Sequence, residues 1–244
     1  MQCPKCGHEL RPGGRFCSHC GAAVEAAGST HRSQRLSMTP EVAAALEAAR
    51  RPLKADVVFV IDTTGSMSDK IEGLLKTCLA FAHELASSSI DYRLGLIGFG
   101  DLLLKEKMSI YPPTDKAETF QGWIKELPRT GGGDEPESSL DAVREALRLE
   151  FRPDAQKVVI LITDAPPHDP DTRGYSAEKV TGLLCEAKAL AFCITPPLRC
   201  WQEMAERTGG EWFEIKSDAN FIPIIGRLAK TVSKTVTLRL TGRL

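Results

Sequence analysis

The sequence has little net charge, no secretion signal and no long apolar run, and each absence excludes a class of protein. Its 244 residues include 31 lysines and arginines and 32 acids, so the net charge of -1 gives no overall positive field to attract nucleic acid or anionic lipid. The opening residues, MQCPKCGHEL, lack a charged segment followed by a long apolar stretch. No later apolar run approaches the roughly 20 residues of a membrane span. We therefore expect a cytosolic, cytoplasmic protein.

Cysteine occurs in a pattern typical of metal binding rather than of disulfides. The chain has eight cysteines, and in a reducing compartment thiols more often bind metal or lie in cores. Four of them form two Cys-x-x-Cys-Gly units, Cys3 with Cys6 and Cys17 with Cys20. Each glycine permits the tight turn that aims amides at the sulfurs, and two such turns complete a tetrahedral zinc site. Residues 1–21 resemble the short zinc ribbons at the front of many bacterial proteins.

Two alternatives to zinc remain for these cysteines: iron in a rubredoxin-like site, or four incidental core residues. His8 and His19 lie inside the cluster, but four sulfurs already complete the shell of a structural zinc ion, so we expect both histidines on the surface. Four thiolates with one Zn²⁺ carry a negative charge that offsets the basic side chains of the segment. A nearly neutral ribbon favours protein docking or a structural role over nucleic-acid binding.

The rest of the chain predicts a linker followed by an α/β domain. Residues 22–54 form the linker and a lead-in helix that begins at Thr39 and ends before Pro52. The main domain is expected at 55–232 and a terminal strand at 233–244, where apolar and polar residues alternate.

Within the main domain, short β-branched runs alternate with amphipathic segments. Strands are expected at 57–61, 92–100, 157–163, 191–195 and 211–215. Helices are expected at 69–86, 116–127, 136–149, 176–189, 198–208 and 219–230. Strands that are apolar on both faces and separated by helices predict a doubly wound, mostly parallel sheet with helices on both faces.

The stretch VVFVIDTTGSMSDK runs from an expected strand directly into oxygen-bearing side chains. Asp62, Thr64 and Ser66 occupy alternate positions there, and Asp134 and Asp164 lie in two further loops. In parallel sheets, ligands bind beyond the carboxyl ends of the strands, where such loops converge. Oxygen ligands of this kind suit Mg²⁺ or Mn²⁺ better than zinc. The sequence therefore predicts one metal ion held by three loops.

From about residue 55 to 215 the chain resembles a von Willebrand factor A domain. This family has a metal-ion-dependent adhesion site built from D-x-S-x-S, a separate threonine and a strand-end aspartate; IDTTGSM is similar to the first motif and LITDAPP to the third. The resemblance implies that Thr64 and Ser66 coordinate the ion through their hydroxyls, and that Asp62 and Asp164 hold it largely through water. The remaining position would take a carboxylate of a protein partner.

The second motif, GGGDEPE, departs from the family pattern, which commonly has threonine after the glycines. Asp134 is the best counterpart and Thr130 the reserve candidate. With Asp62, Asp134 and Asp164 ionised, the negative charge of the site exceeds the charge of the ion, so an acidic partner should be held less strongly than in adhesion receptors. The substitution Asp134→Thr should then tighten carboxylate binding.

Two alternative roles for this cluster are open. Asp62, Thr64 and Ser66 could serve only as caps of the first helix. Alternatively, an acid at a strand end followed by a hydroxyl suggests a phosphoryl-transfer enzyme of the haloacid-dehalogenase type, although that class usually has a second Asp where Thr64 stands. The chain also lacks a GxxxxGK[ST] loop, an HExxH motif and a GxSxG motif.

Nucleic-acid binding through the ribbon is a third possibility, with a basic flank formed by Arg32, Arg35, Arg50 and Arg51. The interpretation that we favour is a non-catalytic module that binds a protein partner, as a cytosolic adaptor. Asp101 and His168 are expected near the metal loops. The interpretation that we favour is that they are ordinary solvated loop residues, and the alternative is that they shape partner specificity or add water-mediated contacts. Cys78 and Cys193 are expected in the core.

Overall fold

The computed structural model describes most of the chain, in two units. The described residues are 2–10, 16–23, 39, 53–131, 135–215 and 221–242, with only the backbone described at Phe221. The division falls between residues 51 and 52, and each unit is described by itself. The lead-in helix expected between Thr39 and Pro52 lies outside the described residues, as do most of the expected linker and Asp134.

The amino-terminal unit contains two turns of the same design. The Gly7 amide donates to the Cys3 carbonyl at 2.8 Å, and the Gly21 amide donates to the Cys17 carbonyl at 2.9 Å. Gly7 and Gly21 have φ of 73° and 68°, a conformation that glycine adopts without the steric cost of a side chain. Antiparallel bridges close the turns, pairing Gln2 with Glu9 and Phe16 with Ala23.

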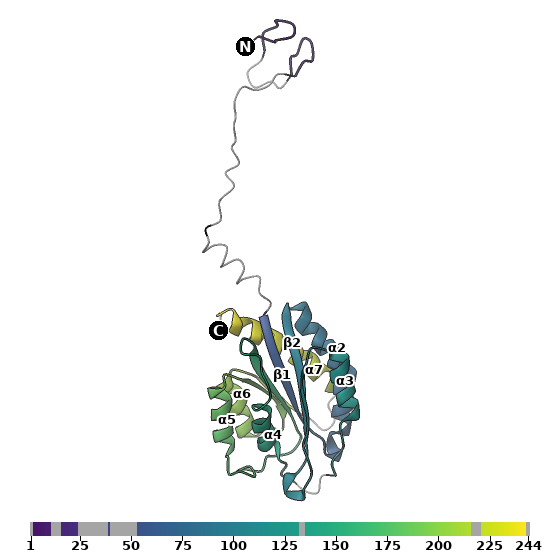
Figure 1. The fold of residues 1–244 in the computed structure, drawn as a ribbon, viewed down its shortest axis with the longest axis vertical. Helices are drawn as coiled ribbons and strands as arrows, with labels where there is room; N and C mark the ends of the chain where they lie inside the picture. Colours follow the sequence, from purple (N-terminus) through teal and green to yellow (C-terminus); the bar gives the residue numbers. More distant parts are fainter. Residues whose placement is uncertain are drawn as a thin grey trace. The chain divides into compact units, whose positions relative to one another are not determined.

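The second unit is built around a six-stranded sheet with the order β3-β2-β1-β4-β5-β6 (Figure 1). Its strands are β1 (Leu53–Asp62), β2 (Ile90–Phe99), β3 (Ser109–Thr114), β4 (Gln156–Ile162), β5 (Leu190–Thr195) and β6 (Trp212–Glu214). Every neighbouring pair is parallel except β2 with β3, which is antiparallel. The prediction of a mostly parallel sheet is confirmed.

Strand β3 does not appear among the expected strands, because its sequence, SIYPPT, contains Pro112 and Pro113. Proline cannot donate to a ladder and is confined to edge strands and bulges. Here both conditions hold: β3 lies at the end of the sheet order, and the register shifts between Leu94 and Leu96 of its neighbour β2.

Helices cover both faces of the sheet (Figure 1). They are α2 (Ser68–Ser87), α3 (Ala117–Glu126), α4 (Ser139–Ala146), α5 (Ala177–Glu186), α6 (Arg199–Thr208) and α7 (Phe221–Leu240), with 3₁₀ turns η1 (Gly65–Met67) and η2 (Leu102–Leu104). One core joins Phe59 of the sheet to Phe81, Phe120 and Leu228 of α2, α3 and α7. The other core contains α4, α5 and α6, including the fully buried Trp201. This arrangement confirms the doubly wound α/β class.

The terminal strand expected at 233–244 is wrong, because α7 continues through this segment to Leu240. The alternating residues TVTLRL suggest a strand, but Ile225, Val232 and Val236 are buried at helical spacing. Packing of α7 against α2 therefore overrides the β propensity of valine and threonine. Of the helices in the described part of the chain, none combines the length and apolarity needed to cross a membrane.

The parallel strands bring the first and third predicted metal loops to the carboxyl end of the sheet. The register pairs Asp62 at the end of β1 with Phe99 at the end of β2, and Ile61 with Ile162 at the end of β4. The loops that follow these strands therefore begin side by side, as the position of ligand sites in such sheets requires.

Candidate metal centres

The amino-terminal cysteines form a compact cluster whose donor set fits a structural zinc ion. Their sulfur atoms, those of Cys3, Cys6, Cys17 and Cys20, all lie within 4.8 Å of one another. The Lys5 amide, which bonds the Cys3 sulfur, is the largest influence that lowers the pKa of Cys3 to about 7. The His8 amide lowers the pKa of Cys6, but the neighbouring thiols raise it to about 12. Four thiolates this close need a cation, and Zn²⁺ supplies it. His8 and His19 are exposed, as predicted.

The Asp62 carboxylate at the end of β1 is fully buried, and among the described residues its hydrogen-bond partners are neutral. Its Oδ1 accepts from the Thr64 amide at 2.9 Å and from the Thr64 hydroxyl at 2.6 Å, and its Oδ2 accepts from the Thr163 hydroxyl at 2.7 Å. Burial raises the pKa of Asp62, these hydrogen bonds lower it and the charge of Asp164 raises it again, so the pKa lies above its usual value.

A line of side-chain oxygens continues from Asp62 to Asp164. The Thr64 Oγ1 lies 3.4 Å from the Ser66 Oγ, which donates to the Asp164 Oδ1 at 3.0 Å. Thr64 is buried, whereas Ser66 is exposed and Asp164 is half-buried. The structure thus brings together these predicted residues, with one end of the line open to solvent, while Asp134 lies outside the described residues.

A role limited to helix capping does not fit the geometry of these residues. Thr64 is the N-cap of η1 and makes no side-chain capping bond. The N-cap of α2 is Met67, again without a side-chain capping bond. The hydroxyls of Thr64 and Ser66 are directed at Asp62 and Asp164 instead.

The donor set fits Mg²⁺ or Mn²⁺. It consists of two carboxylates and two hydroxyls, the hard oxygen ligands that these ions prefer. Lys70, on the first turn of α2, donates to the Ser66 carbonyl at 3.2 Å and pairs with Asp69 at 3.0 Å, so this buried ammonium is engaged away from Asp62. An ion bound between Asp62 and Asp164 would supply the positive charge that the buried carboxylate lacks.

The loop that follows β2 connects the second metal loop, which includes Thr130 and Gly131, to the carboxyl end of the sheet. The Glu106 carboxylate accepts from the Asp101 amide at 2.7 Å and from the Gly131 amide at 2.8 Å. The neighbouring Thr130 amide donates to the Thr63 carbonyl at 3.0 Å, and the two threonine hydroxyls also lie 3.0 Å apart. Thr130, the reserve candidate, is therefore tied to the residue between Asp62 and Thr64.

The same loop is joined to the third metal loop by Asp101, which is only 2% exposed. Its Oδ1 lies 3.1 Å from the His168 Nε2 and 3.3 Å from the Ser138 Oγ, and it accepts from the Leu103 amide at 2.8 Å. The prediction that Asp101 is a solvated loop residue is wrong, because this carboxylate organises the loop around it. His168 is half-buried rather than fully solvated.

Sequence reasoning missed Glu106, Ser138 and Thr163, which support the site. Thr163 could have been found, since it precedes Asp164 at the end of β4, where a hydroxyl can face the neighbouring strand end. Glu106 and Ser138 lie in loops with no comparable signal.

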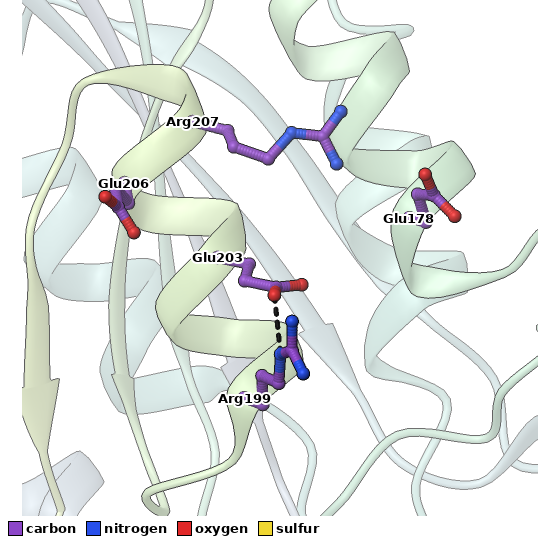
Figure 2. A pocket seen from close by; sticks show the side chains of 5 residues that line it. All are labelled: Glu178, Arg199, Glu203, Glu206 and Arg207. Atoms are coloured by element: carbon purple, nitrogen blue, oxygen red, sulfur yellow. Dashed lines mark hydrogen bonds and ion pairs between the residues drawn. The ribbon is translucent and has the colours of Figure 1, made fainter.

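A hollow of about 730 Å³ lies between α5 and α6 and is separate from the metal residues (Figure 2). Its lining consists of Glu178, Arg199, Glu203, Glu206 and Arg207. The Arg199 Nε donates to the Glu203 Oε1 at 2.6 Å, and Arg207 extends from α6 toward α5 (Figure 2). This lining has mixed charges and includes no metal-site residue.

Comparisons with known proteins agree with the fold. Residues 56–217 match the family described as von Willebrand factor A domain, and residues 2–24 match the family described as zinc-ribbon domain. Alpha-protein kinase vwkA of Dictyostelium discoideum is 28% identical over 131 residues, covering 52% of this chain and 21% of that protein. The chain thus spans about a fifth of the length of this curated relative.

Two solved structures share the fold at low identity. An aerotolerance-related membrane protein from Bacteroides fragilis has a TM-score of 0.52 at 15% identity, covering 74% of this chain and 99% of that one. The pilus adhesin SpaC from Lactobacillus rhamnosus, in an open conformation, has a TM-score of 0.57 at 13% identity, covering 75% of this chain and 30% of that one. Together with the family match over residues 56–217, this fold establishes that the chain belongs to the von Willebrand factor A domain family.

Proposed function

We propose that the chain is a non-catalytic module that binds a protein partner through Mg²⁺ or Mn²⁺ at a metal-ion-dependent adhesion site. Asp62, Thr64, Ser66 and Asp164 hold the ion, with Asp134 as a further acid from the second loop. The observation that carries this proposal is the continuous line of oxygens from Asp62 to Asp164, spanning contacts of 2.6, 3.4 and 3.0 Å.

The accessibility of the line supports binding of a partner rather than a closed structural site. Asp62 and Thr64 are buried, while Ser66 is exposed. An ion held against Ser66 and Asp164 therefore keeps coordination positions on the solvent side, and Mg²⁺ retains water or takes an external oxygen there. A partner's Asp or Glu carboxylate can replace that water.

The residue at the general-acid position favours binding over catalysis. Phosphoryl transfer of the haloacid-dehalogenase type needs a general acid near the strand-end aspartate. The position is occupied by Thr64, whose hydroxyl donates to Asp62 at 2.6 Å. Lys70 is directed at a backbone carbonyl, and His168 faces Asp101.

An adaptor role in the cytoplasm completes the proposal. Cys78, Cys185, Cys193 and Cys200 are all free thiols, which suits a reducing compartment. The kinase relative carries its matching segment in a much longer chain, and SpaC is an adhesin. By analogy with both, we propose that this domain recruits a partner and that the zinc ribbon serves docking or folding.

The test is a crosslinking pull-down from host extract in Mg²⁺, with the zinc-loaded protein. The variant Ser66→Ala/Asp164→Asn removes two ligands at accessible positions, so the fold should be retained. The matched control, Ser87→Ala/Asp115→Asn, makes the same changes at exposed positions outside the site. We expect the partner to be lost with the first variant or without Mg²⁺, and kept with the control. A partner retained by Ser66→Ala/Asp164→Asn in metal-free buffer would contradict the proposal.

A further inference from the structure

Two large apolar side chains are exposed on the loop that joins the metal loops. Leu103 is 62% exposed and Leu104 is 50% exposed. A single exposed leucine needs no explanation, but two adjacent ones on a loop beside a candidate binding site form a contact surface. Lys105 and Lys107 follow them and are also exposed. Residues 103–107, which we call the tip of this loop, thus present apolar area next to positive charge.

This tip is held in one conformation. The Leu103 amide donates to the Asp101 side chain at 2.8 Å, and the Leu104 and Glu106 amides both donate to the Asp101 carbonyl at 3.1 Å. The Lys105 amide donates to the Leu102 carbonyl at 3.0 Å. A surface fixed in advance loses little conformational entropy when a partner binds.

The base of the tip is continuous with the metal site. Asp101 contacts His168 of the third metal loop, and Glu106 bonds Gly131 of the second. The Gly131 carbonyl in turn lies 4.0 Å from the position that a Cβ would take on Gly65, the residue before Ser66. The loop that bears the tip is therefore linked by hydrogen bonds to the second and third metal loops.

We propose that Leu103, Leu104, Lys105 and Lys107 select the partner, which is a protein segment with an apolar side chain close to its acidic residues. One carboxylate of this segment completes the metal shell, the apolar side chain packs on the two leucines, and further acids face the lysines. Charge complementarity with Lys105 and Lys107 favours an acidic segment as this occupant. The inference rests on the proposed function and adds the chemistry of the partner.

The experiment uses random peptides displayed on phage, selected on the full zinc-loaded chain in Mg²⁺. We expect recovered peptides to contain Asp or Glu with Leu, Ile or Phe within a few residues. The variant Leu103→Ser/Leu104→Ser should bind them about tenfold more weakly, the scale expected for losing burial of large apolar side chains. Its Mn²⁺ binding, followed by electron paramagnetic resonance, should stay unchanged. Leu79→Ser, at a leucine of α2 that is 39% exposed, is the matched control and should bind like the wild type.

The outcomes separate the two proposals. Acidic peptides that need Mg²⁺ but show no apolar preference, and that bind Leu103→Ser/Leu104→Ser as tightly as wild type, would overturn this inference and leave the proposed function standing. Recovery of no Mg²⁺-dependent peptide would contradict the proposed function, and this inference with it.

Discussion

Asp56 and Asp62 lie near opposite ends of strand β1, and both are fully buried. At the amino end, the Asp56 carboxylate accepts from the Arg93 side chain at 3.0 and 2.6 Å, from the Arg152 Nε at 2.9 Å and from the Arg152 amide at 2.6 Å. At the carboxyl end, Asp62 accepts only from Thr64 and Thr163 among the described residues. One buried acid has its cations built into the chain, and the other has no cationic partner among the described residues.

The pKa values of the two acids reflect this difference in their partners. Burial alone raises the pKa of Asp56, but the hydrogen bonds and charges of Arg93 and Arg152 outweigh it, so the pKa lies below its usual value. Burial leaves the pKa of Asp62 above its usual value. A buried carboxylate without a paired charge is costly, and such groups gather at functional sites. Asp56 is therefore part of the framework, whereas the proposed function gives Asp62 a cation from solution.

The largest expected effect is the difference in stability loss between the Asp56→Asn and Asp62→Asn variants, measured in metal-free buffer. Asp56→Asn leaves two guanidinium groups without their carboxylate and should lower the free energy of unfolding by about 3 kcal/mol, near the lower end for broken buried pairs. The lower end applies because the Arg93 and Arg152 side chains are 26% and 20% exposed.

Asp62→Asn should change the free energy of unfolding by less than about 1 kcal/mol, because the neutral amide still accepts from Thr64 and can donate to Thr163. Urea denaturation followed by tryptophan fluorescence measures both variants. Equal losses in the free energy of unfolding for Asp56→Asn and Asp62→Asn would contradict the difference that we infer between the two acids.

Lowering the pH should remove the contribution of the Asp56 carboxylate to the free energy of unfolding. Its folded pKa lies below its unfolded value of about 3.9, so the stabilisation is present above that value and is lost as pH falls through the folded pKa. The stability difference between wild type and Asp56→Asn should therefore shrink below about pH 4. Urea titrations at neutral and acidic pH measure this stability difference. A difference that stays constant with pH would contradict the claim that Arg93 and Arg152 stabilise the ionised Asp56 carboxylate.

Mg²⁺ should stabilise the wild type, since the proposed site exists only in the folded chain. At a free concentration ten times the dissociation constant, linkage predicts a gain of about 1.4 kcal/mol in the free energy of unfolding. Ser66→Ala/Asp164→Asn should lose this gain, whereas Asp56→Asn should keep it. Thermal unfolding with and without Mg²⁺ provides the measurement, and a gain that survives the loss of Ser66 and Asp164 would place the ion elsewhere.

A further small effect is expected in the loop that supports the site. Glu106→Gln has one carbonyl oxygen for the two amides of Asp101 and Gly131, so one hydrogen bond is lost. We expect a loss of about 1 kcal/mol in stability and a few-fold weaker Mn²⁺ binding, although the proposed ligand set does not include Glu106. Unchanged Mn²⁺ affinity would show that the second loop keeps its position without this carboxylate.

Local patterns predicted most of the strands and the first metal loop, because both depend on residues close in sequence. Strand runs and helical periodicity set the layers, and a strand-end motif placed Asp62, Thr64 and Ser66 together. The two wrong predictions of secondary structure have physical causes. The prolines of β3 are unusual in a strand, and the β-branched residues at the end of α7 have a preference for strands. Asp101 reaches His168 across 67 positions, and the Leu102 amide reaches Ser138 across 36. Such contacts depend on the folded topology and leave no local pattern.

The decisive experiment is a Mn²⁺ titration of the zinc-loaded protein, followed by electron paramagnetic resonance, comparing wild type, Asp62→Asn and Asp56→Asn. We predict that wild type and folded Asp56→Asn bind the ion alike, while Asp62→Asn binds it at least about tenfold more weakly, a difference of about 1.4 kcal/mol. Equal binding by all three proteins would contradict the claim that Asp62 is buried without a cation in order to receive one.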